Sequence, residues 1–246
     1  MRRPTIAVCA LGCLVTLAGT ASAQFVVREN VHVAPGTVAE FETLSKSRTA
    51  RMSEGGVTFA RLAAVAEGNG LYRFQTLLDD TFDSVNVWRE QIAGLPAGTT
   101  PGAAGGIIES IDRSIWLTHA DLSYTPDPLR VQNDDIGFVR EVLLRPKFGS
   151  APQVSELVGE LSDLYRRNNI AGRRVVRELV MGSGGPAFAV VFVARDAQDF
   201  YAEQARTQAT LGSELQQLVA RIGRLCRDVD FSNYLARQDL GYQPGN

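Results

Sequence analysis

The spacing of apolar and polar positions predicts that the chain passes twice through one order of strands and helices. In residues 25–34, valines alternate with polar side chains, which is the period of a half-buried strand. Apolar residues three and four apart predict helices at 37–52 and 81–95. The strands of this first pass are predicted at residues 25–34, 59–66, 71–78 and 115–124.

The second pass repeats this order. A strand around Val139 ends at Phe148-Gly149-Ser150, where a helix carrying an apolar stripe to Tyr165 begins. Later helices are predicted from Asp196 to about Leu211 and over 213–226. The remaining strands are predicted at residues 174–181, 187–194 and 234–242.

Two segments resemble each other closely enough to indicate an internal repeat. Residues 116–126 and 234–244 share the pattern aromatic-Leu-x-x-x-Asp-Leu-x-Tyr-x-Pro at an offset of 118. Near the start of each pass, Val27-Arg28-Glu29 matches Val139-Arg140-Glu141 at an offset of 112. We therefore predict an α+β protein of two tandem ferredoxin-like βαββαβ units, residues 24–126 and 137–246, joined by a linker over 127–136.

The element order, the repeat and the helix pattern Phe82-x-x-Val85-x-x-Trp88-Arg89 resemble the dimeric α/β-barrel superfamily. That group includes antibiotic-biosynthesis-monooxygenase-like, NIPSNAP-like and heme-degrading proteins. The resemblance implies that the two units pack sheet to sheet as a pseudo-dimeric α/β barrel, so that a monomer replaces a homodimer. It also offers Asn30, Trp88 and His119 for heme chemistry, although neither histidine is predicted on a helix, where an iron ligand would be expected. Heme is therefore an alternative, and our main expectation is no cofactor.

The N-terminus has the features of a secretory signal peptide over residues 1–23. Arg2 and Arg3 precede a short apolar run, and Ala21-Ser22-Ala23 is a small-residue cleavage site. We therefore expect a secreted or periplasmic protein with no membrane span after cleavage. The mature chain would carry 23 basic and 27 acidic residues, a balance that argues against nucleic acid as a partner.

The mature chain would keep one cysteine, Cys226, so no internal disulfide is expected. Apolar residues precede it at helical spacing, which predicts a buried packing role. Neither histidine lies near it, and we predict no metal site. Trp88, on an apolar helical stripe, is predicted to lie in the core.

Polar side chains on the strands are the best candidates for a site. Alternation places a set of them on one sheet face of the first unit: Arg28, Asn30, His32, Arg61, Arg73, Gln75, His119 and Asp121. One interpretation is an ion-pair network that docks the two units, in which Asp121 and Asp239 serve the fold because both copies of the repeat have an Asp at this position. The other is a cavity that binds a small polar or anionic molecule. His119 is favoured because the repeat has Arg237 there. The predicted ligand-binding residues are His119, Arg237, Arg28, Asn30, His32 and Arg73.

No nucleophile elbow, catalytic triad order or phosphate-cradling glycine loop is present in the sequence. We therefore expect an exported, non-catalytic protein that binds a small molecule or partner. One alternative is a monooxygenase-like enzyme, which the family resemblance implies. Another is a structural or interaction module.

Overall fold

The computed structural model describes residues 24–66, 68, 70–95 and 105–244, and the predicted signal peptide at 1–23 lies outside them. The first unit contains β1 (Gln24–Val33), α1 (Val38–Glu54), β2 (Arg61–Ala66), β3 (Leu71–Leu77), α2 (Asp83–Ala93) and β4 (Ile108–Tyr124). The second contains β5 (Phe138–Pro146), α3 (Ala151–Arg167), β6 (Arg174–Met181), β7 (Phe188–Ala194), α4 (Ala197–Leu225) and β8 (Cys226–Ala236). A short 3₁₀ helix, η2 (Asn133–Asp135), lies between the units, and η3 (Gln238–Leu240) follows β8.

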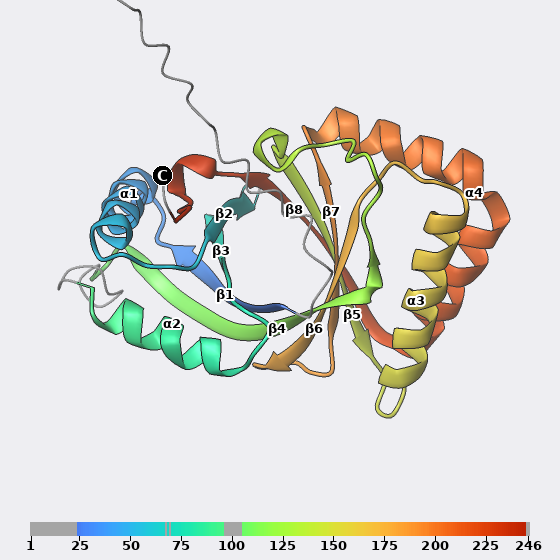
Figure 1. Cartoon of the computed structure of the whole chain (residues 1–246), viewed down its shortest axis with the longest axis horizontal. Coiled ribbons are helices and arrows are strands. Elements are labelled where there is room, and N and C mark those ends of the chain that lie inside the picture. The colour runs from blue at the N-terminus through green and yellow to red at the C-terminus, as the bar shows by residue number, and fades with distance from the viewer. Residues whose placement is uncertain (1–23, 67, 69, 96–104, 245–246) are drawn as a thin grey trace, which may run out of the picture.

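The eight strands close into one antiparallel barrel in the order β1-β3-β2-β8-β5-β7-β6-β4. Within each unit this is the ferredoxin-like order, and the pairs β2–β8 and β4–β6 join the units. Figure 1 shows α1 and α2 outside one half of the barrel and α3 and α4 outside the other. The predicted pseudo-dimeric α/β barrel is therefore confirmed. None of the helices within the described residues is long and apolar enough to cross a membrane.

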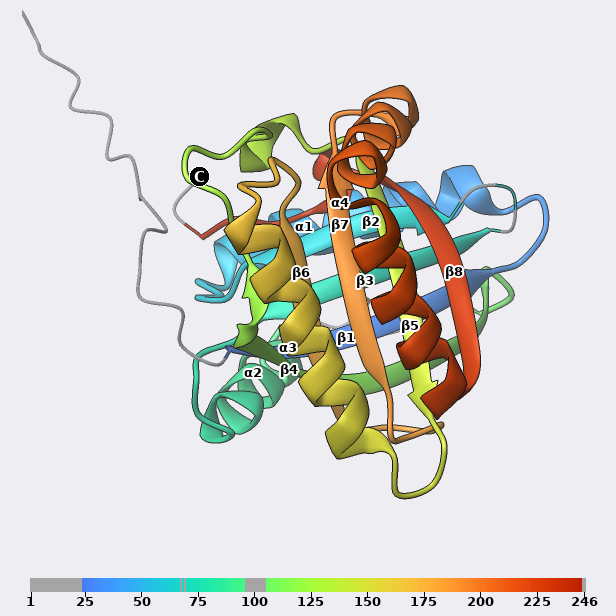
Figure 2. The same cartoon turned by 90° about the vertical axis from the view of Figure 1, so that its right-hand side faces the viewer.

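The apolar stripe of each helix packs on the outer face of the strands below it. The largest cluster lies under α3 and α4, which run side by side over the second unit in Figure 2, and includes Leu157, Leu164, Val176 and Phe188. In the first unit, Trp88 of α2 is buried against Val27 and other apolar residues, as predicted. Because helices cover the outer face, the polar groups on the inner face meet those of the opposite unit.

The final helix contains a sharp break. The sequence predicts two helices that meet near residue 212, and the structure joins them into α4 with a kink at Gly212, where φ is +50° and ψ is −125°. Residues with a Cβ rarely adopt this backbone conformation, so a glycine allows the change of direction. Cys226 begins β8 and is buried in the cluster under α3 and α4, which confirms its predicted packing role.

The end of the second repeat differs from the prediction. A strand was expected over 234–242, but β8 ends at Ala236 and η3 follows. Tyr242 returns to β2, where its N–H donates to the Arg61 carbonyl oxygen at 2.7 Å. A Cβ at Gly241 would lie 3.0 Å from that same oxygen, so glycine permits this close approach. The repeated pattern therefore marks the end of β4 in one copy and a strand followed by a turn in the other.

The predicted alignment of the first strands of the two units, at an offset of 112, is also wrong by one residue. Arg28 faces the barrel interior, where it bonds Glu141, whereas Arg140 faces outward and lies over Phe200 of α4. A shift of one residue along a strand moves every side chain to the other face. The register instead aligns Arg28 with Glu141, because Arg28 pairs with Ser114 and Glu141 pairs with Ser232, and these serines are 118 residues apart.

Candidate functional site

The structure brings together three of the six predicted ligand-binding residues. Arg28 and Arg73 both bond Glu141 inside the barrel, at 2.7 and 2.8 Å. Asn30 accepts a hydrogen bond from Arg73 Nε at 2.9 Å. His32 lies on the same face of β1, close to the end of the strand. These positions match the predicted polar face.

The other two residues lie elsewhere. His119 is on the outside of the barrel, where its Nε2 is 2.8 Å from Glu178. Arg237 lies beyond β8 and bonds Glu42 of α1 and Asp239. The expectation that His119 and Arg237 face the space between the sheets is therefore wrong. Trp116 faces the interior, against Arg28, so alternation along β4 puts His119 outside, and β8 ends before Arg237.

Arg61 and the two aspartates were also placed wrongly. Arg61 is buried on the outer face, stacked on Phe74 at 3.6 Å. Asp121 is 79% exposed, and Asp239 pairs with Lys46 and Arg237 at the surface. Inside the barrel, the carboxylate that joins the two units is Glu141. Its burial tends to raise its pKa, but Arg28 and Arg73 outweigh that effect and hold the pKa below its usual range.

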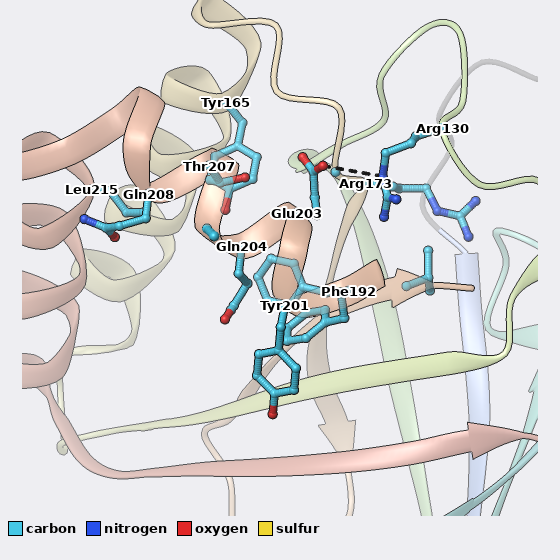
Figure 3. Close-up of a pocket in the computed structure, with 14 residues that line it drawn as sticks. Arg130, Tyr165, Arg173, Phe192, Tyr201, Glu203, Gln204, Thr207, Gln208 and Leu215 are labelled. Carbon is cyan, nitrogen blue, oxygen red and sulfur yellow. Dashed lines mark ion pairs between the residues drawn. The ribbon is translucent and has the colours of Figure 1, made fainter. Parts of the chain in front are cut away.

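One pocket lies outside the barrel, between α4 and the strands of the second unit. Its cavity volume is about 370 Å³. Its wall is formed by the first half of α4, α3, β7, the turn before β6 and the segment between the two units, as Figure 3 shows. The residues that line it and carry rings or charges are Arg130, Tyr165, Arg173, Phe192, Phe200, Tyr201 and Glu203.

Aromatic rings make up much of this wall. Phe200 contacts the rings of Phe192 and Tyr201, with centroids 6.4 and 5.2 Å apart. Phe200 is buried, whereas Tyr201 is 52% exposed. Tyr165 contributes a fourth ring from α3, and burial raises the pKa of its phenol. Such a wall suits a flat, largely apolar ligand.

Three charged groups lie at one side of the pocket. Glu203 is the only carboxylate among the described lining residues, and its Oε2 accepts from Arg206 at 2.9 Å and lies 3.8 Å from Arg130 Nε. Figure 3 shows Glu203 between Tyr165 and Arg130. Among the described residues, no hydrogen bond reaches Glu203 Oε1, Arg130 Nε or Arg173 Nε. This side of the pocket therefore carries one carboxylate and two guanidinium groups, of which Arg130 is also paired with Asp199 at 2.5 Å.

The sequence prediction missed this pocket. Phe192, Phe200 and Tyr201 have the spacing of ordinary core residues, and Arg130 belongs to the predicted linker. Gly212, within a long helical pattern, was a signal that could have indicated the pocket. The helix kinks at this glycine, between Phe200 and Leu215, and both of these residues line the pocket.

The donor set does not fit heme iron. Protein ligands to heme iron are His, Cys, Met or Tyr, and the lining residues include only Tyr165 and Tyr201 of these types. The raised pKa of Tyr165 favours the neutral phenol, a poor iron ligand. No group of three or more His, Cys, Asp or Glu in the described part of the chain is arranged to hold a metal ion.

Comparisons with known proteins place this fold among enzymes. No family model and no curated protein matches the sequence. An anthrone oxidase-like protein is 10% identical, with a TM-score of 0.65 over 92% of this chain and 94% of that one. A candidate monooxygenase from Lactobacillus acidophilus NCFM is 9% identical, with a TM-score of 0.60 over 91% and 97%. A chlorite dismutase from Candidatus Nitrospira defluvii, in complex with imidazole, is 9% identical, with a TM-score of 0.51 over 88% and 93%.

These neighbours share the fold of this chain, in agreement with the predicted α/β barrel. They contradict our main functional expectation, because the structures that share this fold are described as enzymes rather than as non-catalytic binding proteins. The non-catalytic expectation was based on the absence of nucleophile and metal motifs from the sequence. A site that binds a substrate between aromatic rings and orients it with a few polar groups needs neither.

Proposed function

We propose that this chain is a monooxygenase-like enzyme that oxidises a planar aromatic compound in the pocket beneath α4. The observation that carries this proposal is the pairing of an aromatic wall with Glu203, Arg130 and Arg173 at one side of the pocket. The fold likeness to an anthrone oxidase-like protein and to candidate monooxygenases supports it. We infer a substrate with a ring carbonyl or phenol beside an activated methylene group.

The arrangement supports proton abstraction followed by reaction with dioxygen. The Glu203 carboxylate accepts a proton from the methylene carbon, as a general base. The guanidinium groups of Arg130 and Arg173 stabilise the negative charge that develops on the substrate oxygen. Dioxygen is the oxidant. One of its atoms ends on the carbon as a new carbonyl, and the other leaves as water with the two methylene hydrogens.

Oxygen consumption by the purified protein tests this proposal. The probe is a tricyclic aromatic ketone with one activated methylene, and ¹⁸O₂ labels the product for mass spectrometry. We expect oxygen uptake and one labelled atom in each product molecule. Glu203→Gln keeps the shape of the side chain and removes its basicity, so we expect the rate to fall by about a hundredfold or more.

A matched control is Glu160→Gln, since Glu160 pairs with Arg221 on the surface of α3, away from the pocket lining. This variant should keep the wild-type rate. The proposal fails if the wild-type protein neither binds nor oxidises any such ketone, or if Glu203→Gln retains full activity. A heme absorption band in the active protein would contradict the cofactor-free route.

We also propose that the enzyme acts outside the cytoplasm, after removal of residues 1–23. The support for this is the charged, apolar and small-residue sequence of that segment. N-terminal sequencing of protein recovered from the periplasm or medium would identify the expected new terminus at Gln24. Recovery of the chain with Met1 from the cytoplasm would contradict export.

A further inference from the structure

The barrel interior contains more positive than negative charge. Arg28, Arg73 and Arg177 surround Glu141, and each of the four residues is at most 8% exposed. Arg28 and Arg73 form ion pairs with Glu141, whereas Arg177 forms no ion pair among the described residues and donates to the amide oxygen of Gln75, at 2.6 Å. Three guanidinium groups and one carboxylate leave an excess of two positive charges. Buried charge of this kind is costly unless it is compensated.

Several hydrogen-bond donors in the same space also lack a partner. Arg28 Nε, Arg177 Nε and the Thr118 hydroxyl are buried and make no hydrogen bond within the described part of the chain. Thr118 is the strand neighbour of Arg177, so the two side chains share the inner face of the barrel. Arg173, which directly precedes β6, adds a further positive charge near Arg177. An anion would accept from such donors and balance the charge.

A second cluster, on the outer face of the first unit, also has three arginines around one carboxylate, but one of these arginines is partly exposed to solvent. Glu29 is near Arg48, Arg61 and Arg113. There the Arg113 side chain is 50% exposed, so water screens part of its charge. In the interior, no arginine of the cluster has comparable access to solvent. The interior cluster therefore differs from the outer one in that all three of its arginines are buried.

We propose that the barrel interior binds a small oxyanion, a carboxylate or a phosphate, between Arg177, Arg28 and Thr118. Guanidinium groups bind both kinds of oxyanion through paired N–H donors. Arg73 and Arg177 keep the largest exposed fraction of the four residues of the interior cluster, 8% each. This site is distinct from the pocket under α4, because none of Arg28, Thr118 and Arg177 lines that pocket.

Thermal unfolding with added anions tests the site. Sodium phosphate and sodium succinate are compared with sodium chloride at matched ionic strength, and binding is measured by calorimetry. We expect a saturable rise in Tm with phosphate or with succinate beyond the effect of chloride. A response to one probe alone identifies the class of anion. Arg177→Met should lower the affinity at least tenfold, and Thr118→Val severalfold, because each removes donors.

Arg221→Met is the matched control, since Arg221 is exposed on α4 and pairs with Glu160. It should keep the full anion response, and so should Glu203→Gln, which separates this site from the proposed enzyme activity. If Arg177→Met does not fold, Thr118→Val carries the test alone, because it preserves shape and charge. The proposal is overturned if neither probe exceeds chloride, or if Thr118→Val and Arg177→Met respond as the wild-type protein does.

Discussion

Arg28 and Glu141 occupy the same position in the two units and bond each other across the barrel at 2.7 Å. Their strands, β1 and β5, are four places apart in the closed ring of eight, so the pair spans the interior. In a symmetric homodimer this position would bring two identical residues together. Fusion of the units into one chain allows opposite charges there, and the pair fixes how the units dock.

Glu141→Gln should destabilise the protein by about 3–5 kcal/mol, because it leaves buried arginines without their carboxylate. Chemical denaturation at neutral pH measures the free energy of unfolding. Glu156→Gln, an exposed position on α3, is the control and should change stability by less than about 0.5 kcal/mol. Equal effects of the two substitutions would mean that Glu141 does not hold the units together.

Acid should weaken the protein through two carboxylates of depressed pKa. A hydrogen bond from Arg237 lowers the pKa of Glu42 to about 2, and Arg28 and Arg73 hold the pKa of Glu141 below its usual range despite burial. A carboxyl with a lowered folded-state pKa contributes stability that is present above its unfolded pKa and is lost as pH falls toward the folded value. We therefore expect stability to decline from about pH 4.5 toward pH 2.

Arg237→Gln tests the contribution of Glu42 together with that of Asp239, because Arg237 donates to both carboxylates and lowers the pKa of each. The variant should lose less stability between pH 5 and pH 2 than the wild-type protein does. Denaturation curves at several pH values measure the difference. An unchanged acid dependence would mean that the pairs of Arg237 with Glu42 and Asp239 contribute nothing to folding.

The sequence predicted the architecture because each strand and helix carries a strong local pattern. The alternation in β1 and the apolar stripe of α3 are set by which side faces a helix, and both elements lie where expected. The relative register of the two copies was not predictable from identities alone. Val27-Arg28-Glu29 matches Val139-Arg140-Glu141 in letters, yet one residue of register reverses which side chain enters the barrel.

Site residues were predicted less well because their surroundings come from distant segments. The role proposed for Glu203 depends on Arg130, which lies in the segment between the units, and on rings from β7 and α4. Arg177 is charged and buried because the opposite unit covers it, which no local pattern reports. Arg28 and Arg73 were identified correctly as interior residues because β1 and β3 alternate regularly.

Trp88→Ala should destabilise the protein by about 3–5 kcal/mol, because it removes a large buried ring from the cluster under α2. Val87→Ala, at the adjacent and exposed position of the same helix, is the control and should cost less than about 1 kcal/mol. Denaturant midpoints compare the two. Similar losses for both substitutions would show that the ring does not contribute as a core residue.

His119→Ala should change stability by less than about 1 kcal/mol at neutral pH, because its partner Glu178 is 41% exposed. Since His119 lies outside both the barrel interior and the lining of the pocket, the variant should keep wild-type oxygen uptake and anion response. Val176→Ala, at the buried strand neighbour of His119, should be far more destabilising. Loss of either function in His119→Ala with stability intact would restore it as a site residue.

Gly212 and Gly223 should respond to alanine with opposite signs, although both lie in α4 and a Cβ at either position would have open space around it. At Gly212, the positive φ of +50° strains any residue with a Cβ, so Gly212→Ala should cost about 1–3 kcal/mol. At Gly223 the backbone is helical, so Gly223→Ala should stabilise the protein by up to about 1 kcal/mol. Because the kink separates Phe200 from Leu215 in the pocket wall, Gly212→Ala should also weaken ketone binding, measured by calorimetry. Stabilisation by Gly212→Ala would mean that α4 straightens without cost and that the kink does not shape the pocket.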